Sequence, residues 1–181
     1  TLTGLANRVA FMTHANELFH QAGSFIKRAI LFIDLDNFKN VNDTLGHDYG
    51  DLLLQQIAEK LSTLMSEEDL LARTGGDEFL VLRNQVHTQD ELDQFASQLI
   101  AISNHPFQLN DEVVHVSMSI GIAIFPQNGL TINELIKNAD IAMYSAKQAG
   151  KSGYRFFNSS MEDEVNHKNE LEEILRNAIQ N

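Results

Sequence analysis

The sequence feature that most constrains the fold is a pair of glycines between two short apolar segments. Residues 70–73 and 78–82 flank Thr74-Gly75-Gly76-Asp77 in a chain of 181 residues. Glycine reaches the positive φ angles of a tight turn because it has no Cβ atom to clash with the backbone. The pattern therefore predicts a β-hairpin with the glycines at its tip.

Other segments repeat apolar residues every three or four positions, which predicts amphipathic helices. They are residues 7–22, 49–65, 89–103 and 131–149, with a polar loop expected at residues 40–48. Gly23 and Gly150 are the expected stops of the first and the last of these helices. Beyond residue 159 the chain is acidic and then carries an apolar stripe that needs a partner, formed by Leu171, Ile174, Leu175 and Ala178.

Further segments predict strands. Residues 29–33 are a short apolar run rich in β-formers, residues 114–125 alternate apolar with polar side chains, and residues 154–157 suit an edge strand. Because strands are mixed with crossover helices, we expect an α/β or α+β fold around one central sheet.

Acidic residues gather at two predicted strand ends. Asp34 and Asp36 follow the strand 29–33 and point the same way if the strand continues, and Asp77 and Glu78 follow the glycine pair. Acids at strand ends and turns are often merely solvated, and that alternative stays open. If the hairpin pairs beside the first strand, Asp77 would lie near Asp34 and form a metal cage suited to phosphoryl transfer.

Composition limits the partners of such a site. The chain has no cysteine, so a metal would be held by carboxylate, carbonyl or imidazole groups, which favours Mg²⁺. The net charge of −12 would repel a nucleic-acid polymer, whereas a small polyphosphate stays possible because salt screens charge beyond about 8–10 Å. No apolar run approaches the roughly 20 residues that span a bilayer, so we expect no direct membrane insertion.

The residues around the glycine pair resemble the signature of the GGDEF family of diguanylate cyclases. Six motifs follow the family order and spacing between residues 1 and 157, which makes the resemblance highly specific. The motifs are Leu2-Thr3-Gly4-Leu5-Ala6-Asn7-Arg8, Asp34-Leu35-Asp36-Asn37-Phe38-Lys39-Asn40-Val41-Asn42-Asp43, Gly46-His47-Asp48-Tyr49-Gly50-Asp51, Arg73-Thr74-Gly75-Gly76-Asp77-Glu78-Phe79, Ser119-Ile120-Gly121-Ile122-Ala123, and Ala139-Asp140-Ile141-Ala142-Met143-Tyr144-Ser145-Ala146-Lys147.

The resemblance implies a palm-like GGDEF fold, with a central, mostly antiparallel five-stranded sheet flanked by helices. It also implies that Asp34, the carbonyl of Leu35 and Asp77 hold Mg²⁺ (or Mn²⁺) against a triphosphate. Asp77 would also be the base for the attacking 3′-hydroxyl, and Glu78 a nearby helper.

The same resemblance implies GTP as substrate. Asn42 and Asp51 would read guanine, because a carboxylate accepts from its N–H groups while an amide can serve its acceptors. His47 would lie next to the nucleotide, and Phe38 and Leu54 would line the site of the guanine base.

Three lysines complete the implied nucleotide site. Lys39 would neutralise phosphate charge in the transition state, and Lys147 and Lys151 would grip the terminal phosphates. Taken singly, a lysine or a histidine is more often a solvated surface residue.

The implied reaction joins two GTP molecules into cyclic di-GMP with release of two pyrophosphates. Each GTP supplies one nucleophile and one electrophile, so two half-sites must face each other in a homodimer. The implied location is the cytoplasm, or the cytoplasmic part of a membrane-anchored protein.

Two departures bear on regulation. Many family members carry an inhibitory Arg-x-x-Asp motif before the signature, but Ser66 stands here in place of the arginine. The tail resembles the helix that leads into an EAL phosphodiesterase domain, so we expect a GGDEF domain at residues 1–158, a connector at 159–181, and attached EAL and sensor domains. A rival function is a GTP-binding regulatory module that controls an attached EAL domain and makes no product.

Overall fold

A computed structural model of the protein describes residues 1–21 and 26–180. The elements in chain order are α1 (Arg8–Gln21), β1 (Arg28–Asp36), α2 (Phe38–Leu45), α3 (His47–Thr63), β2 (Leu70–Gly75), β3 (Glu78–Arg83), α4 (Gln89–Ile102), β4 (Phe107–Leu109), β5 (Glu112–Val114), β6 (Ser117–Phe125), α5 (Ile132–Gln148), β7 (Gly153–Phe156) and α6 (Ser159–Gln180). The end of the first predicted helix, with Ala22 and Gly23, lies outside the described residues.

The central sheet has five strands in the order β2-β3-β1-β6-β7. β1 pairs antiparallel with β3 and with β6, β2 and β3 form the predicted hairpin, and β7 joins β6 in parallel at the edge. The expectation of a mostly antiparallel five-stranded sheet is therefore confirmed.

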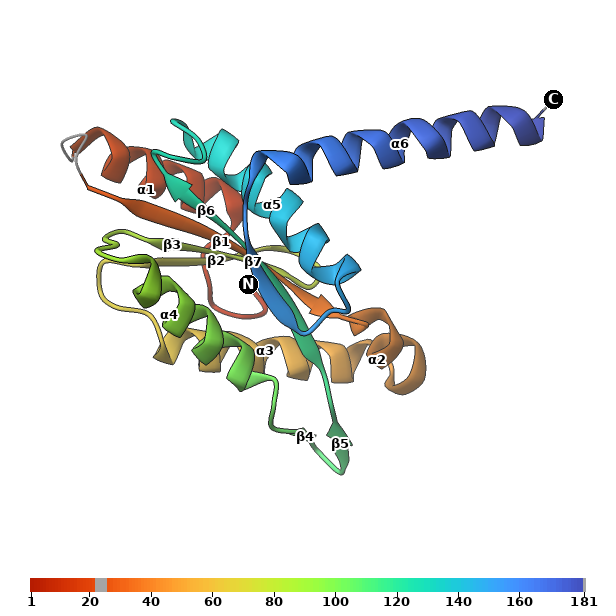
Figure 1. Cartoon of the computed structure of the whole chain (residues 1–181). Coiled ribbons are helices and arrows are strands. Elements are labelled where there is room, and N and C mark those ends of the chain that lie inside the picture. The colour runs from red at the N-terminus through yellow and green to blue at the C-terminus, as the bar shows by residue number, and fades with distance from the viewer. Residues whose placement is uncertain (22–25, 181) are drawn as a thin grey trace.

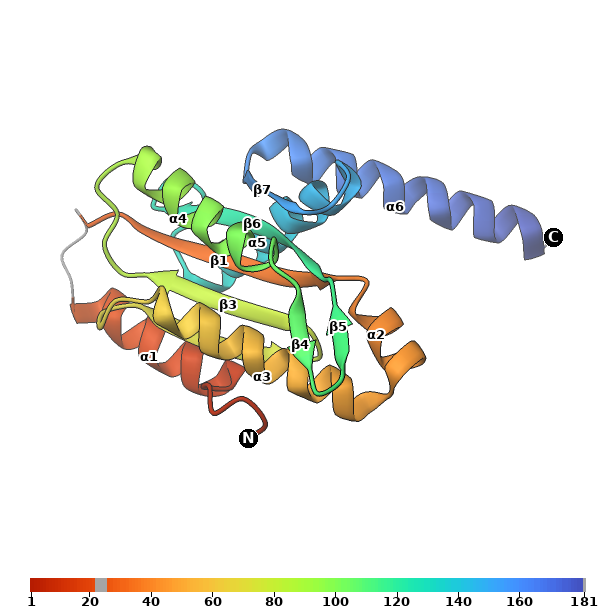
Figure 2. The same ribbon diagram turned by 90° about the horizontal axis from the view of Figure 1, so that it is seen from below.

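Helices cover both faces of this sheet, with α1 and α5 on one side and α3 and α4 on the other (Figures 1 and 2). The side chains of β1 alternate between the two layers. Leu31 and Ile33 pack with the α3 and α4 side, while Ile30 and Phe32 pack with the α1 and α5 side. Burial on both faces explains why β1 reads as a continuous apolar run rather than as an alternating one.

Gly121 sets how closely α5 approaches the sheet. A Cβ atom built at this position in β6 would lie 1.9 Å from the carbonyl oxygen of Ala139 and 2.2 Å from the backbone nitrogen of Met143. Only glycine leaves room for the helix backbone at that distance. The close packing fixes the middle of α5 against the middle of β6.

Two predictions about local structure were wrong. Residues 40–48 form no loop but most of α2 and the start of α3, because Phe38 and Val41 are spaced to bury one face of a helix. Gly46, with φ 96°, lets the chain turn between the two helices without a longer connection.

The predicted strand 114–125 is interrupted. Val114 ends β5, which pairs with β4 in a separate two-stranded ribbon, and Ser117 begins β6 in the central sheet. The alternating pattern runs through both pieces and does not mark the break between the two sheets.

The last helix, α6, projects from the domain (Figure 1). Its first turns are held by buried Met161 and by an ion pair between Lys137 and Glu162, 3.0 Å apart. Farther along, Leu171, Ile174 and Leu175 are exposed. Within residues 1–21 and 26–180, no helix is both long and apolar enough to cross a bilayer.

We expect Gly121→Ala to lower the free energy of unfolding by more than about 3 kcal/mol, because its methyl group meets backbone atoms that cannot move independently. Urea denaturation measures the effect. Gly153→Ala is the matched control, since its nearest neighbour lies at 3.8 Å, and it should change stability by less than about 0.5 kcal/mol. Similar unfolding midpoints for the two variants would contradict the packing argument.

Candidate active site

The tip of the β2–β3 hairpin lies against the end of β1. In the antiparallel register, Asp34 stands opposite Glu78, and the backbone N–H of Leu35 donates to the carbonyl oxygen of Asp77 at 3.2 Å. The negative charge of the Asp77 carboxyl contributes to raising the pKa of Asp34. The structure thus brings Asp77 to the end of β1, close enough to Asp34 for the two carboxyl charges to repel each other.

Asp34 is the most electrostatically strained group of this site. Burial raises its pKa to about 6, the nearby Asp77 carboxyl adds to the rise, and the hydrogen bond from Lys147 opposes it. One of its carboxylate oxygens, Oδ1, is buried and accepts no hydrogen bond from any described residue. A buried carboxylate oxygen that accepts no hydrogen bond, next to a second negative charge, would be stabilised by a hard cation.

The charge of Asp34 also affects two further carboxyl groups. The pKa of Glu78 is raised, first by burial and then by the charge of Asp34, and the pKa of Asp140 in α5 is raised for the same two reasons. Arg8 partly opposes both shifts. Sequence reasoning did not single out Asp140 or Arg8, although both stand inside motifs that it quoted.

Lys147, in the last turn of α5, reaches into this group of acids. Its Nζ atom lies 3.0 Å from Oδ2 of Asp34 and 3.8 Å from Oδ1 of Asp36. Lys151, just beyond the helix, instead donates to the amide oxygen of Asn37 at 2.9 Å. Lys147 and Lys151, to which the resemblance assigns the terminal phosphates, therefore both lie at the end of β1, and of the two only Lys147 contacts carboxylates.

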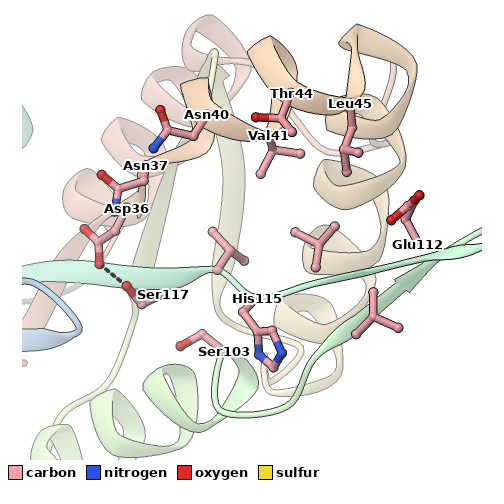
Figure 3. A pocket seen from close by; sticks show the side chains of 13 residues that line it. Asp36, Asn37, Asn40, Val41, Thr44, Leu45, Ser103, Glu112, His115 and Ser117 are labelled. Carbon is pink, nitrogen blue, oxygen red and sulfur yellow. Dashed lines mark hydrogen bonds between the residues drawn. The ribbon is translucent and has the colours of Figure 1, made fainter.

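Asp36 differs from Asp34 because its carboxylate is fully engaged. It accepts from the hydroxyls of Ser117 and Ser119 at 2.6 and 2.7 Å, and from the backbone N–H of Ser152 at 3.0 Å. Figure 3 shows the bond to Ser117. Asp36 thus ties β1 to β6 and to the loop after α5. Sequence reasoning gave these serines no role, although Ser117 and Ser119 lie on the polar side of the alternating segment and Ser119 opens one of the quoted motifs.

A second part of the site lies between α2 and α3. The amide oxygen of Asn42 is buried and finds no donor within the described ranges, and a Cβ atom on Gly50 would come within 1.9 Å of it. The same Cβ would lie 3.2 Å from the ring of Phe38. Gly50 therefore leaves the space in which Asn42 and Phe38 sit.

The other predicted nucleotide residues fall into two groups. Leu54 is buried in the core like Phe38, so both lie beneath the surface of the helix pair. Lys39, His47 and Asp51 are exposed on α2 and α3. The residues predicted to hold the metal therefore lie at the end of β1. Those predicted to contact the guanine base lie on the adjacent helix pair.

A cavity of about 610 Å³ opens on a different face of α2 (Figure 3). It lies between α2 and the segment from β5 to β6 and is lined by Asp36, Asn37, Asn40, Val41, Thr44, Leu45, Ser103, Glu112, Val113, Val114, His115, Val116 and Ser117. Its described lining includes none of the residues that the sequence assigned to metal or nucleotide.

We expect Asp34→Asn to stabilise the metal-free protein. A folded pKa of about 6 against an ordinary value of 3.8 means that the ionised form opposes folding, so the stability from this group is present below about pH 4 and lost as the pH rises through 6. The substitution should raise the free energy of unfolding by on the order of 2 kcal/mol at about pH 7.5, and by less than half of that near pH 4.5.

Denaturation in EDTA at the two pH values measures this difference. Asp163→Asn on exposed α6 is the control and should have no effect. Destabilisation by Asp34→Asn at the higher pH would contradict the electrostatic account.

Comparison with known proteins identifies the family. Residues 1–153 match the family described as diguanylate cyclase, GGDEF domain. The bifunctional diguanylate cyclase/cyclic di-GMP phosphodiesterase MucR of Pseudomonas aeruginosa is 41% identical over 180 residues, which cover 99% of this chain and 26% of MucR. Cyclic di-GMP phosphodiesterase NbdA of the same organism is 36% identical over 185 residues, covering 99% of this chain and 23% of NbdA.

A solved structure agrees with the sequence matches. The GGDEF domain of TpbB (YfiN) from Pseudomonas aeruginosa superposes with a TM-score of 0.88 at 36% identity, covering 92% of this chain and 98% of that one. The expected palm-like GGDEF fold is thereby confirmed, while the chain spans only about a quarter of MucR and NbdA. On the family match and this shared fold, the chain belongs to the GGDEF family.

Proposed function

We propose that the chain is a diguanylate cyclase that condenses two GTP molecules into cyclic di-GMP. The observation that carries the proposal is the adjacency of the Asp34 and Asp77 carboxyl groups, with one oxygen of Asp34 buried and lacking a donor among the described residues. Two partly buried carboxylates that repel each other lower the free energy of unfolding of the metal-free protein. The arrangement is understandable if a cation binds between them.

Asp34, Asp77 and the carbonyl oxygen of Leu35 would hold Mg²⁺ (or Mn²⁺). Within the described ranges, no three or more carboxylate or imidazole side chains converge as a metal site. Two carboxylates and one carbonyl suit a metal that completes its shell with water and phosphate oxygens. The bound metal would supply charge neutralisation at the reacting α-phosphate.

The neighbouring helix pair would bind the nucleotide. The amide of Asn42 would donate to the acceptors of guanine, and exposed Asp51, on the adjoining helix with His47, would accept from the guanine N–H groups. Phe38 and Leu54 form the apolar base of this region. Lys39, Lys147 and Lys151 would carry positive charge to the phosphates.

In the proposed reaction, the 3′-hydroxyl of one GTP attacks the α-phosphorus of the other and pyrophosphate leaves. The hydroxyl proton passes to Asp77, with Glu78 beside it. Each half-reaction forms one P–O bond and breaks one, and the ring closes only when two half-sites face each other. The proposal therefore includes a homodimer as the active form.

The relatives favour this activity but also a second candidate. MucR is called a bifunctional cyclase and phosphodiesterase, whereas NbdA is called a phosphodiesterase. Because the chain covers about a quarter of each, the second candidate is a GTP-binding regulatory module for an attached EAL domain. The GGDEF signature with both acids in place favours the enzyme.

The projecting helix supports the proposed division into a GGDEF domain at residues 1–158 and a connector at 159–181. Its exposed apolar side chains suit an attached neighbour such as an EAL domain. A sensor domain on the other side and a cytoplasmic location belong to the same proposal.

We expect Asp77→Ala to abolish cyclic di-GMP synthesis, by at least about 10³-fold, while the domain stays folded. The fold should survive because the backbone carbonyl of Asp77, which accepts from Leu35, is kept. Release of pyrophosphate and cyclic di-GMP from GTP and Mg²⁺ is the measurement, with Asp163→Ala as control.

Protein concentration separates the two candidates. For the enzyme, turnover per chain should rise with protein concentration as the dimer forms. If the protein binds GTP but forms no product at any protein concentration, the cyclase activity is excluded and the regulatory module is the remaining candidate.

We also expect weak or no inhibition by cyclic di-GMP next to the signature. Ser66 lacks the guanidinium that grips phosphate, and the carboxylate of Asp69 is engaged by Arg83 at 2.9 Å and by the N–H of Ser66 at 2.9 Å. Calorimetric titration with cyclic di-GMP, with the active site filled by a non-hydrolysable GTP analogue, tests this. Micromolar binding under that condition would refute it.

A further inference from the structure

Lys147 occupies the position between the two acids at the end of β1. Its ammonium lies 3.0 Å from Asp34 and 3.8 Å from Asp36, and its side chain is 23% exposed against 15% and 0% for the two acids. The contact is therefore partly shielded from water. In such a place an ion pair is stronger than on the open surface. Lys147 provides there the positive charge that the neighbouring acids require.

We infer that Lys147 is an internal counter-ion that holds the metal-free site together and is exchanged for the metal when metal and nucleotide bind. The inference rests on the proposed function and adds a second role to the lysine. A lysine suits such an exchange because its ammonium is a compact charge on a flexible stem. When a metal takes over Asp34, the ammonium is released toward the phosphates.

The hydrogen bonds show which acid can exchange its partner. Asp36 accepts three hydrogen bonds in addition to its contact with Lys147, from Ser117, Ser119 and Ser152. Asp34 depends on Lys147 for Oδ2, and its Oδ1 has no donor among the described residues. The exchange therefore takes place at Asp34, while Asp36 holds the loop that follows Lys147 in place.

The consequence is an energetic coupling between metal and nucleotide. Metal that arrives alone must displace the ammonium from Asp34, which weakens metal binding. With nucleotide present, the displaced ammonium gains a phosphate partner. Binding of the metal therefore raises the affinity for the nucleotide, and binding of the nucleotide raises the affinity for the metal. Lys147 carries this coupling because it contacts Asp34, and Lys151 does not, since it bonds to the neutral amide of Asn37.

Lys147→Gln and Lys151→Gln are therefore a matched pair. Titration with Mn²⁺ in the absence of nucleotide, followed by electron paramagnetic resonance, should show metal binding roughly fivefold tighter in Lys147→Gln than in the wild type. Lys151→Gln should match the wild type. Lys147→Arg keeps the charge and should bind metal no tighter than the wild type.

Titration with a non-hydrolysable GTP analogue, with and without Mn²⁺, measures the coupling. Both glutamine variants should lose affinity for the analogue, but the gain in analogue affinity on adding metal should shrink only in Lys147→Gln. Thermal melting in EDTA should show a lower midpoint for Lys147→Gln and a larger rise with Mn²⁺ than for Lys151→Gln.

The outcomes separate the inference from the proposed function. Unchanged or weaker metal binding by Lys147→Gln, in a wild-type background that binds metal and GTP, overturns the counter-ion role alone. A wild-type protein that binds neither metal nor the GTP analogue overturns the proposed function and the inference with it.

Discussion

The rest of the structure depends on the antiparallel pairing of β1 with β3 in the middle of the sheet. This register sets Asp34 opposite Glu78 and brings the hairpin tip to the end of β1, where the N–H of Leu35 bonds to the carbonyl of Asp77. A slip of one residue would turn every side chain of β1 to the other face. Since both faces of β1 are buried by helices, the core and the acidic site are fixed by the same pairing.

Asp34, Glu78 and Asp140 oppose folding when their carboxyl groups are ionised. Burial and mutual repulsion raise the pKa values of Asp34, Glu78 and Asp140, while Lys147 and Arg8 offset only part of the field. The close packing of α5 on Gly121 gives this cluster a rigid support, because it fixes the helix that carries Asp140 and Lys147. Electrostatic strain held by a well-packed scaffold is typical of a functional site.

The two halves of the candidate site are built by different means. The end of β1 uses strand register and the tie from Asp36 to the serines of β6 and to the following loop. The α2–α3 region uses glycines, since Gly46 turns the chain between the helices and Gly50 leaves space for Asn42. The cavity in Figure 3 meets the first half only at Asp36 and Asn37, and its remaining lining comes from α2, from Ser103 and from the segment that joins β5 to β6.

The sequence by itself determined the hairpin, the main helices, the central strands and the family, because periodicity and turn chemistry are local properties. It did not determine helix α2, whose apolar residues are sparse, or the break between β5 and β6, where one alternating pattern serves two sheets. Only the tertiary structure decided that Asp36 is satisfied by serines while Asp34 is left to Lys147. Both aspartates look alike in sequence, and the difference comes from which distant side chains the sheet brings within hydrogen-bonding distance.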